Sequence, residues 1–181
     1  IKREIGSVPL IFRLSADEFV SNGLNIDDMA RISRKLVGFG VDMLHVSTGV
    51  GPDSFDKVLE PMSAPEGWRL PYSRRIREAA GVPVITVGQI RQPATAESAI
   101  ADGDADLVAL GRTLLADPDW ASKALAGREA DIIPCTTCNF CVANGMAERS
   151  IACADNPRTG RELESSISGS QNGSSLSLIH I

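Results

Sequence analysis

Segments with the patterns of strands and helices alternate along most of the chain. Residues 8–14 (VPLIFRL) form a nearly continuous apolar run, which is typical of a strand buried on both faces. Further runs of this kind occupy residues 41–47, 83–87 and 107–110. Helical patterns occupy residues 25–39, 71–80 and 94–102, and a last helix is expected after Asp117-Pro118. Four repeats of strand then helix predict an α/β fold with parallel strands joined by right-handed crossovers.

Two architectures satisfy this repeat: a doubly wound sheet or part of a (β/α)8 barrel. Four units make half a barrel, which leaves two unpaired strand edges and an open core. We therefore expect the stretch to belong to a longer protein. The sequence opens at Ile1 rather than Met, and the first apolar run follows within a few residues without a signal-peptide pattern, so we expect further sequence upstream.

Composition narrows the classes of function. The 181 residues are 43% hydrophobic and 23% charged, which is enough apolar material for a packed core. The net charge of −5 argues against nucleic acid or an anionic membrane as the main partner, although a local basic pocket for a phosphate stays open. No apolar run approaches the roughly 18 residues of a membrane span, so a cytoplasmic location is expected.

The last nineteen residues differ from the rest of the chain. Residues 163–181 contain seven serines, and residues 176–181 (LSLIHI) match the translation of an adapter used in sequencing libraries. We expect this tail to be non-native, in which case His180 carries no chemistry. The alternative is a natural Ser-rich linker.

Two neighbouring strand ends carry candidate phosphate-binding residues. Gly88 follows Val87 at the end of the third strand, and Gly111 followed by Arg112 ends the fourth strand. Glycine lets the backbone approach an anion closely, and an arginine fork suits phosphate oxygens. Barrels commonly bind phosphate at their last two strand ends. The alternative is two ordinary turns and a surface arginine.

Arg13 lies inside the apolar run of the first strand. A guanidinium there needs an anionic or strongly accepting partner, which favours a position facing a site. A reduced flavin ring, negative around N1, is one such partner. A salt bridge to Asp17 is the alternative.

The four cysteines give the most specific pattern. They are spaced Cys135-x2-Cys138-x2-Cys141-x11-Cys153. Three thiolates on one short loop and a fourth from a distal loop can bind a 4Fe-4S cluster, as in ferredoxin-type sites. Zinc more often uses two separated Cys-x2-Cys pairs, and disulfides are not expected in a cytosolic enzyme. Zinc and free thiols remain the alternatives.

These motifs together resemble a known family. The segments are RLSADEFV (13–20), GVDMLHVSTGVG (40–51), VPVITVGQI (82–90), DADLVALGRTLLADPDW (104–120), PCTTCNFC (134–141) and CADNPRTGRE (153–162). Over roughly residues 5–162 the chain resembles the Old Yellow Enzyme-like NADH:flavin oxidoreductase superfamily. Within it, the chain looks like the iron–sulfur branch of 2,4-dienoyl-CoA reductase and trimethylamine dehydrogenase.

The resemblance implies a domain plan and two cofactors. Residues 1–130 would be strands five to eight of an FMN-binding TIM (β/α)8 barrel, its C-terminal half, and residues 131–162 the iron–sulfur segment. FAD- and NAD(P)H-binding regions would follow in the full protein. The implied cofactor-binding residues are Arg13 near flavin N1, then Val87, Gly88, Gly111 and Arg112 at the FMN phosphate, and the four cysteines at the cluster.

The implied activity is reduction of an activated C=C bond in an enoyl or dienoyl small-molecule substrate with electrons from NAD(P)H. Alternatives are an amine dehydrogenase or N-demethylase of the same family, and a zinc-containing phosphate-binding barrel without catalysis. No residue is assigned as the catalytic acid: Asp53 lies in the loop after the second strand, and His45 is expected to pack within that strand. The pattern leaves the oligomeric state open.

Overall fold

A parallel four-stranded sheet forms the centre of the protein, for which a computed structural model describes residues 1–164. The strands are β1 (Ile11–Ser15), β2 (Met43–Ser47), β3 (Val84–Val87) and β4 (Leu107–Ala109). Their order in the sheet is β1-β2-β3-β4, which is the order in the chain. In a doubly wound sheet the strand order reverses at a switch point, after which strands are added to the opposite edge. The unbroken order seen here identifies a partial TIM barrel.

Helices follow each strand, as the sequence pattern predicts. The predicted ones are α2 (Ile26–Gly38), α4 (Leu70–Ala80), α5 (Pro93–Ala101) and α7 (Trp120–Leu125). Short elements that the pattern did not predict are α1 (Lys2–Ile5), α3 (Phe55–Val58), α6 (Arg112–Ala116), the 3-10 helix η1 (Glu129–Asp131) and α8 (Phe140–Met146). The unpredicted elements have seven residues or fewer, which is too short to show a periodic pattern. The six-residue α7 was expected from Asp117-Pro118 and not from a period.

Local signals place the ends of the two helices that cover the sheet. The Asn25 side chain accepts from the backbone of Asp27 and Asp28, and the Asp28 side chain accepts from the Asn25 backbone, which forms a capping box at the start of α2. Gly81 ends α4 in the left-handed conformation, with φ 68°. Both boundaries confirm the predicted helix start at Asn25 and helix end before Gly81.

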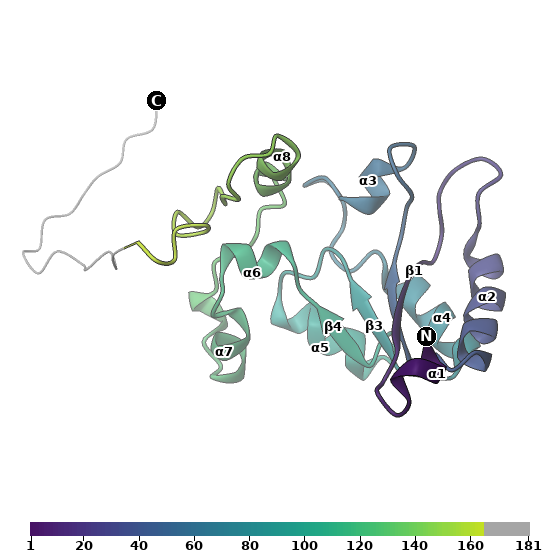
Figure 1. Cartoon of the computed structure of the whole chain (residues 1–181). Helices are drawn as coiled ribbons and strands as arrows, with labels where there is room; N and C mark the ends of the chain where they lie inside the picture. The colour runs from purple at the N-terminus through teal and green to yellow at the C-terminus, as the bar shows by residue number, and fades with distance from the viewer. Residues whose placement is uncertain (165–181) are drawn as a thin grey trace, which may run out of the picture.

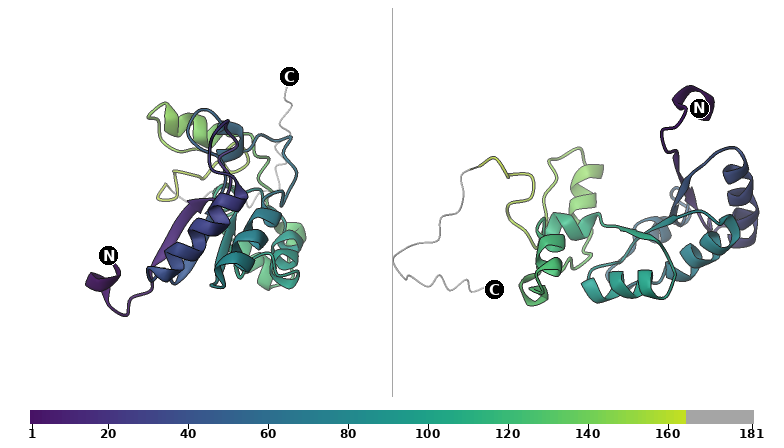
Figure 2. Two further views of the ribbon diagram at one scale, coloured as in Figure 1. Left: turned by 90° about the vertical axis from the view of Figure 1, so that its right-hand side faces the viewer. Right: turned by 90° about the horizontal axis from the view of Figure 1, so that it is seen from below.

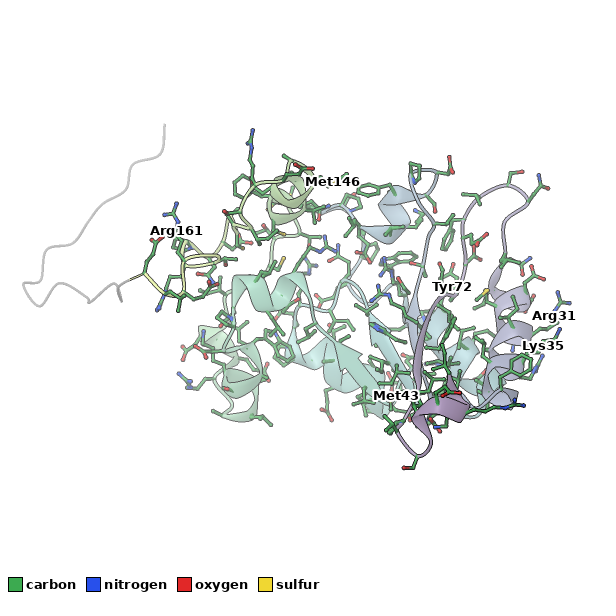
Figure 3. All side chains as sticks on the ribbon, in the orientation of Figure 1. Arg31, Lys35, Met43, Tyr72, Met146 and Arg161 are labelled. Carbon is green, nitrogen blue, oxygen red and sulfur yellow. The ribbon has the colours of Figure 1, made fainter. Side chains whose placement is uncertain are left out.

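The core lies between the sheet and the pair α2 and α4, which lie side by side (Figures 1 and 2). Its members are Leu14, Ala16, Met29, Ala30, Val41, Leu44, Val46, Ile76 and Val84. The outer face of α2 is polar, and Arg31 and Lys35 point away from the sheet (Figure 3). These contacts bury the helix-facing side of β1, β2 and β3.

The other side of the sheet corrects one expectation. The apolar runs predicted strands buried on both faces, yet Ile11 at one sheet edge is 52% exposed and Leu107 at the other is 46% exposed. The observed strands also begin two to three residues later than the runs at residues 8 and 41. In a complete barrel the second face is the interior, which here has no covering element among residues 1–164.

None of the described helices has the length and apolar character needed to cross a membrane. The predicted Ser-rich tail falls almost wholly beyond residue 164, and residues 165–181, His180 included, lie outside the described part of the chain.

Candidate functional site

A cavity of about 270 Å³ lies at the carboxyl ends of β3 and β4. Its walls include the predicted residues Val87, Gly88, Gly111 and Arg112, and also Arg13 from β1. Four arginines contribute to its lining: Arg13, Arg69, Arg112 and Arg91, the last of which pairs with Glu66 at 3.4 Å. The structure thus brings the predicted strand-end residues together in one basic pocket, in a protein with a net negative charge.

The two predicted glycines are not equivalent. Gly88 has φ +113°, and a Cβ on it would lie 2.5 Å from Arg69 Nη1 and 2.6 Å from Glu60 Oε1. A Cβ on Gly111 would meet no atom within 4 Å. Protein side chains therefore fill the space beside Gly88, whereas Gly111 leaves room for a ligand.

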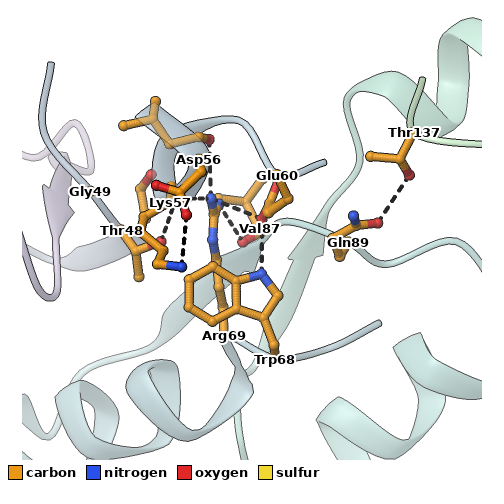
Figure 4. Close-up of polar contacts among 12 residues, drawn as sticks. Thr48, Gly49, Asp56, Lys57, Glu60, Trp68, Arg69, Val87, Gln89 and Thr137 are labelled. Atoms are coloured by element: carbon orange, nitrogen blue, oxygen red, sulfur yellow. Dashed lines mark hydrogen bonds and ion pairs between the residues drawn. The ribbon is translucent and has the colours of Figure 1, made fainter. Parts of the chain in front are cut away.

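Glu60, which pairs with two of the arginines that line the cavity, is a residue that the sequence analysis missed. Its side chain is 1% exposed and lies 2.8 Å from Arg69 Nη2 (Figure 4). It also lies 2.7 Å from Arg112 Nη2. Trp68 Nε1 also donates to Glu60 Oε1, at 3.3 Å. No spacing signal marks Glu60, because it lies in an irregular part of the loop after β2 and is 52 residues from Arg112.

Arg69 is a second missed residue. Its side chain is 4% exposed and donates to the carbonyls of Lys57, Val58 and Val87. Burial lowers the pKa of the Arg69 guanidinium and Glu60 opposes that shift. Nε of Arg69 is the one buried side-chain nitrogen or oxygen in residues 1–164 without a hydrogen-bond partner. One carboxylate thus faces two arginines, which leaves an excess of positive charge beside the cavity.

Arg13 lies on the open face of the sheet, next to its register partner His45. Its Nη2 donates to Ser47 Oγ at 3.2 Å, and Nη1 lies 3.5 Å from His45 Nε2. The alternative partner Asp17 instead accepts from the backbone of Phe19. Burial, and then the charge of Arg13, lower the pKa of His45, which favours the neutral imidazole. Asp53, the other acid considered, is exposed.

The cysteine loop lies against this cavity, and Cys135 and Thr137 form part of its wall. Cys135 and Cys141 are buried, Cys153 is half-buried and Cys138 is exposed. The backbone N–H of Thr137 donates to Cys135 Sγ at 3.4 Å, a type of bond that tunes cluster potentials. In Figure 1 the loop and α8 lie at the end of the sheet that also carries α3, opposite α1.

A returning segment brings the fourth cysteine to the loop. Asp155 accepts from the backbone N–H of Thr136 at 3.0 Å and from its hydroxyl at 3.0 Å. Asn156 and Thr159 both donate to the Leu115 carbonyl at the end of β4's following helix, α6. These contacts hold Cys153 beside the other thiols.

The thiols interact electrostatically, which affects their pKa values. Burial raises the pKa of Cys135 and of Cys141, and the nearby Cys153 raises both further, while Arg112 opposes the shift. Within residues 1–164, no three His, Cys, Asp or Glu side chains gather closely enough for a single metal ion. Four thiols, one of which accepts an N–H···S bond, are the type of ligand that an iron–sulfur cluster uses.

Comparisons with known proteins agree with this geometry. The sequence profile of the NADH:flavin oxidoreductase / NADH oxidase family matches residues 1–131. An NADH oxidase of Thermoanaerobacter brockii is 42% identical over 165 residues, covering 90% of this chain and 25% of the relative.

Two solved structures share the fold. That of 2-naphthoyl-CoA reductase in complex with 2-naphthoyl-CoA has a TM-score of 0.84 at 26% identity, over 91% of this chain and 25% of that one. Histamine dehydrogenase from Rhizobium sp. 4-9 has a TM-score of 0.80 at 25% identity, over 90% and 23%. The chain spans about a quarter of the length of these relatives. It belongs to the NADH:flavin oxidoreductase / NADH oxidase family.

Proposed function

We propose that this chain forms the part of an FMN-dependent oxidoreductase that binds the FMN phosphate and a 4Fe-4S cluster. The observation that carries the proposal is the four-arginine cavity at the ends of β3 and β4, with the four-cysteine segment against its wall. Residues 1–131 match a flavin oxidoreductase family, which supports FMN as the anion's source.

The chain's own residues have distinct tasks in this site. The open space at Gly111 admits the phosphate, and Arg112 and Arg69 supply positive charge that Glu60 only partly neutralises. Arg13, on the open sheet face, places a cation where the flavin ring would lie and so favours its reduced form. When bound, FMN supplies hydride transfer and the cluster supplies one-electron transfer.

For the whole enzyme we propose reduction of an activated C=C bond in an enoyl or dienoyl substrate with NAD(P)H-derived electrons. The likeness to 2-naphthoyl-CoA reductase supports this direction. Because the chain spans a quarter of its relatives, the FAD- and NAD(P)H-binding parts are proposed to lie in a longer cytoplasmic protein. Amine oxidation is the second candidate, because histamine dehydrogenase shares the fold at a TM-score of 0.80.

Purification of the full-length enzyme without oxygen tests the cofactors. We expect a flavin absorbance, about four irons and about four acid-labile sulfides per chain. The Cys135→Ser variant should lose iron, whereas the exposed control Ser150→Ala should keep it. Absence of both flavin and iron would contradict the proposal, and zinc without iron would favour the non-catalytic barrel.

Reduction of the flavin under anaerobic conditions tests the direction of the reaction. We expect NADPH to bleach the flavin absorbance and trimethylamine to leave it unchanged. Bleaching by the amine alone would replace the C=C reductase with an amine dehydrogenase.

A further inference from the structure

Two side chains that lie between the cysteines of the loop contact residues that line the anion cavity. The first is Thr137, which is 2% exposed and whose hydroxyl donates to Gln89 Oε1 at 3.1 Å (Figure 4). Gln89 directly follows Gly88 and lines the cavity. This contact joins the loop after β3 to the cysteine loop.

The second side chain is Asn139, which lies between Cys138 and Cys141. Its Nδ2 donates to the Glu60 carbonyl at 3.0 Å, and its Oδ1 accepts from Arg112 Nη1. Arg112 Nη1 also donates to the Glu60 carbonyl at 3.1 Å. Asn139, Glu60 and Arg112 therefore form a closed set of hydrogen bonds that fixes the direction of the Arg112 guanidinium.

The backbone at these contacts is held in an unfavourable conformation. Gln89, Thr137 and Asn139 have φ of 49°, 57° and 59°, in the left-handed region that side chains other than glycine rarely adopt. This conformation costs a β-branched threonine more free energy than most residues. It persists only where surrounding contacts hold it. The contacts of Thr137 with Gln89 and of Asn139 with Glu60 and Arg112 help to hold the loop in this conformation.

We propose that Asn139 is a positioning residue that aims Arg112 at the phosphate and so couples the cysteine loop to FMN binding. This inference rests on the proposed function, since it takes the cavity as the phosphate site. Coupling between two sites is reciprocal, so the phosphate should also stabilise the cysteine loop. Binding of the flavin ring does not use Arg112, so it should not depend on Asn139.

Flavin titrations of the deflavinated full-length enzyme, followed by fluorescence quenching, separate binding of the phosphate from binding of the flavin ring. FMN and riboflavin differ by the phosphate alone. In Asn139→Ala we expect FMN affinity to fall about fivefold, the effect of one net hydrogen bond, with riboflavin affinity unchanged. The matched control is Asn144→Ala, a half-buried asparagine on α8 whose side chain, among residues 1–164, bonds only to the Phe140 carbonyl. It should leave both affinities unchanged.

A second variant and readout guard against misfolding. Asn139→Asp keeps the size of the side chain and tolerates the left-handed backbone, but places a negative charge beside Arg112, so FMN affinity should fall further. Iron release to a chelator should be slowed by FMN, more than by riboflavin, in the native enzyme and in Asn144→Ala. This difference should vanish in Asn139→Ala.

The outcomes distinguish the two proposals. If the native enzyme prefers FMN to riboflavin but both Asn139 variants keep the same preference, the positioning role is wrong and the phosphate site stands. If the native enzyme shows no preference for FMN, the phosphate site itself is wrong and the coupling falls with it.

Discussion

At the scale of single residues, the two strand-end glycines serve different purposes. Gly88 combines φ +113° with close contact to Arg69 and Glu60, so its lack of a side chain is needed to build the protein. Gly111 has no positive φ and no neighbour within 4 Å of a Cβ, so its lack of a side chain matters to a ligand. Sequence position alone makes the two look alike.

Alanine at each glycine should separate these roles. Gly88→Ala should lower the free energy of unfolding by about 1–3 kcal/mol, because it strains the backbone and displaces the Arg69–Glu60 pair. Gly111→Ala should change it by less than about 0.5 kcal/mol but weaken FMN binding. Urea unfolding and FMN titration of the full-length enzyme measure both. A Gly88→Ala variant as stable as the native enzyme would contradict this assignment.

At the scale of elements, the site is assembled from three loops and one returning segment. The loops after β3 and β4 provide the cavity, and the cysteine loop closes one wall of it. The segment that carries Cys153 is held by Asp155 on Thr136 and by Asn156 on α6. Assembly of the proposed cluster would therefore depend on a contact between two irregular segments.

Loss of that contact should loosen the fourth ligand. In Asp155→Ala, Thr136 loses its partner and Cys153 is less well held, so iron should be released to a chelator several-fold faster. The matched control is Asp131→Ala, an exposed carboxylate that pairs with Arg128. Equal release rates in the native enzyme and Asp155→Ala would show that the returning segment is held by other contacts.

At the scale of the whole molecule, four strands form an incomplete barrel. The helices cover one face of the sheet, while apolar side chains at both edge strands, including Ile11 and Leu107, stay about half exposed. Unpaired edges and an uncovered apolar face favour association with other chains. The relatives span about four times this length, which is consistent with a fold completed by further sequence.

Expressed by itself, the 181-residue chain should be unstable, prone to association and inactive. Charges at its two edges should reduce the association, because they oppose edge pairing: the double variant Ile11→Lys, Leu107→Lys should give smaller species by light scattering. Lysines on the polar face of α2, such as Arg31→Lys, provide the control. A native chain that is monomeric and melts cooperatively would contradict this expectation.

Most of the fold was predictable because its signals are local. Apolar periodicity located the four strands and the main helices, and the Asn25 cap and Gly81 marked helix ends. Short helices such as α6 and α8 were not predicted, because one or two turns are too few to show a periodic pattern of apolar residues. The cysteine spacing and the strand-end glycines were visible for the same local reason, although phosphate and cluster binding remain predictions.

What the sequence determined by itself was the repeat of strand and helix, the cysteine spacing and the family, since each depends on residues close together in the chain. Only the tertiary structure decided how Glu60 meets Arg112, 52 residues away, and Asn139, 79 residues away. It also decided which glycine is crowded and which is open. Such contacts join irregular loops, where no periodicity records which side chains face each other, so folding alone determines them.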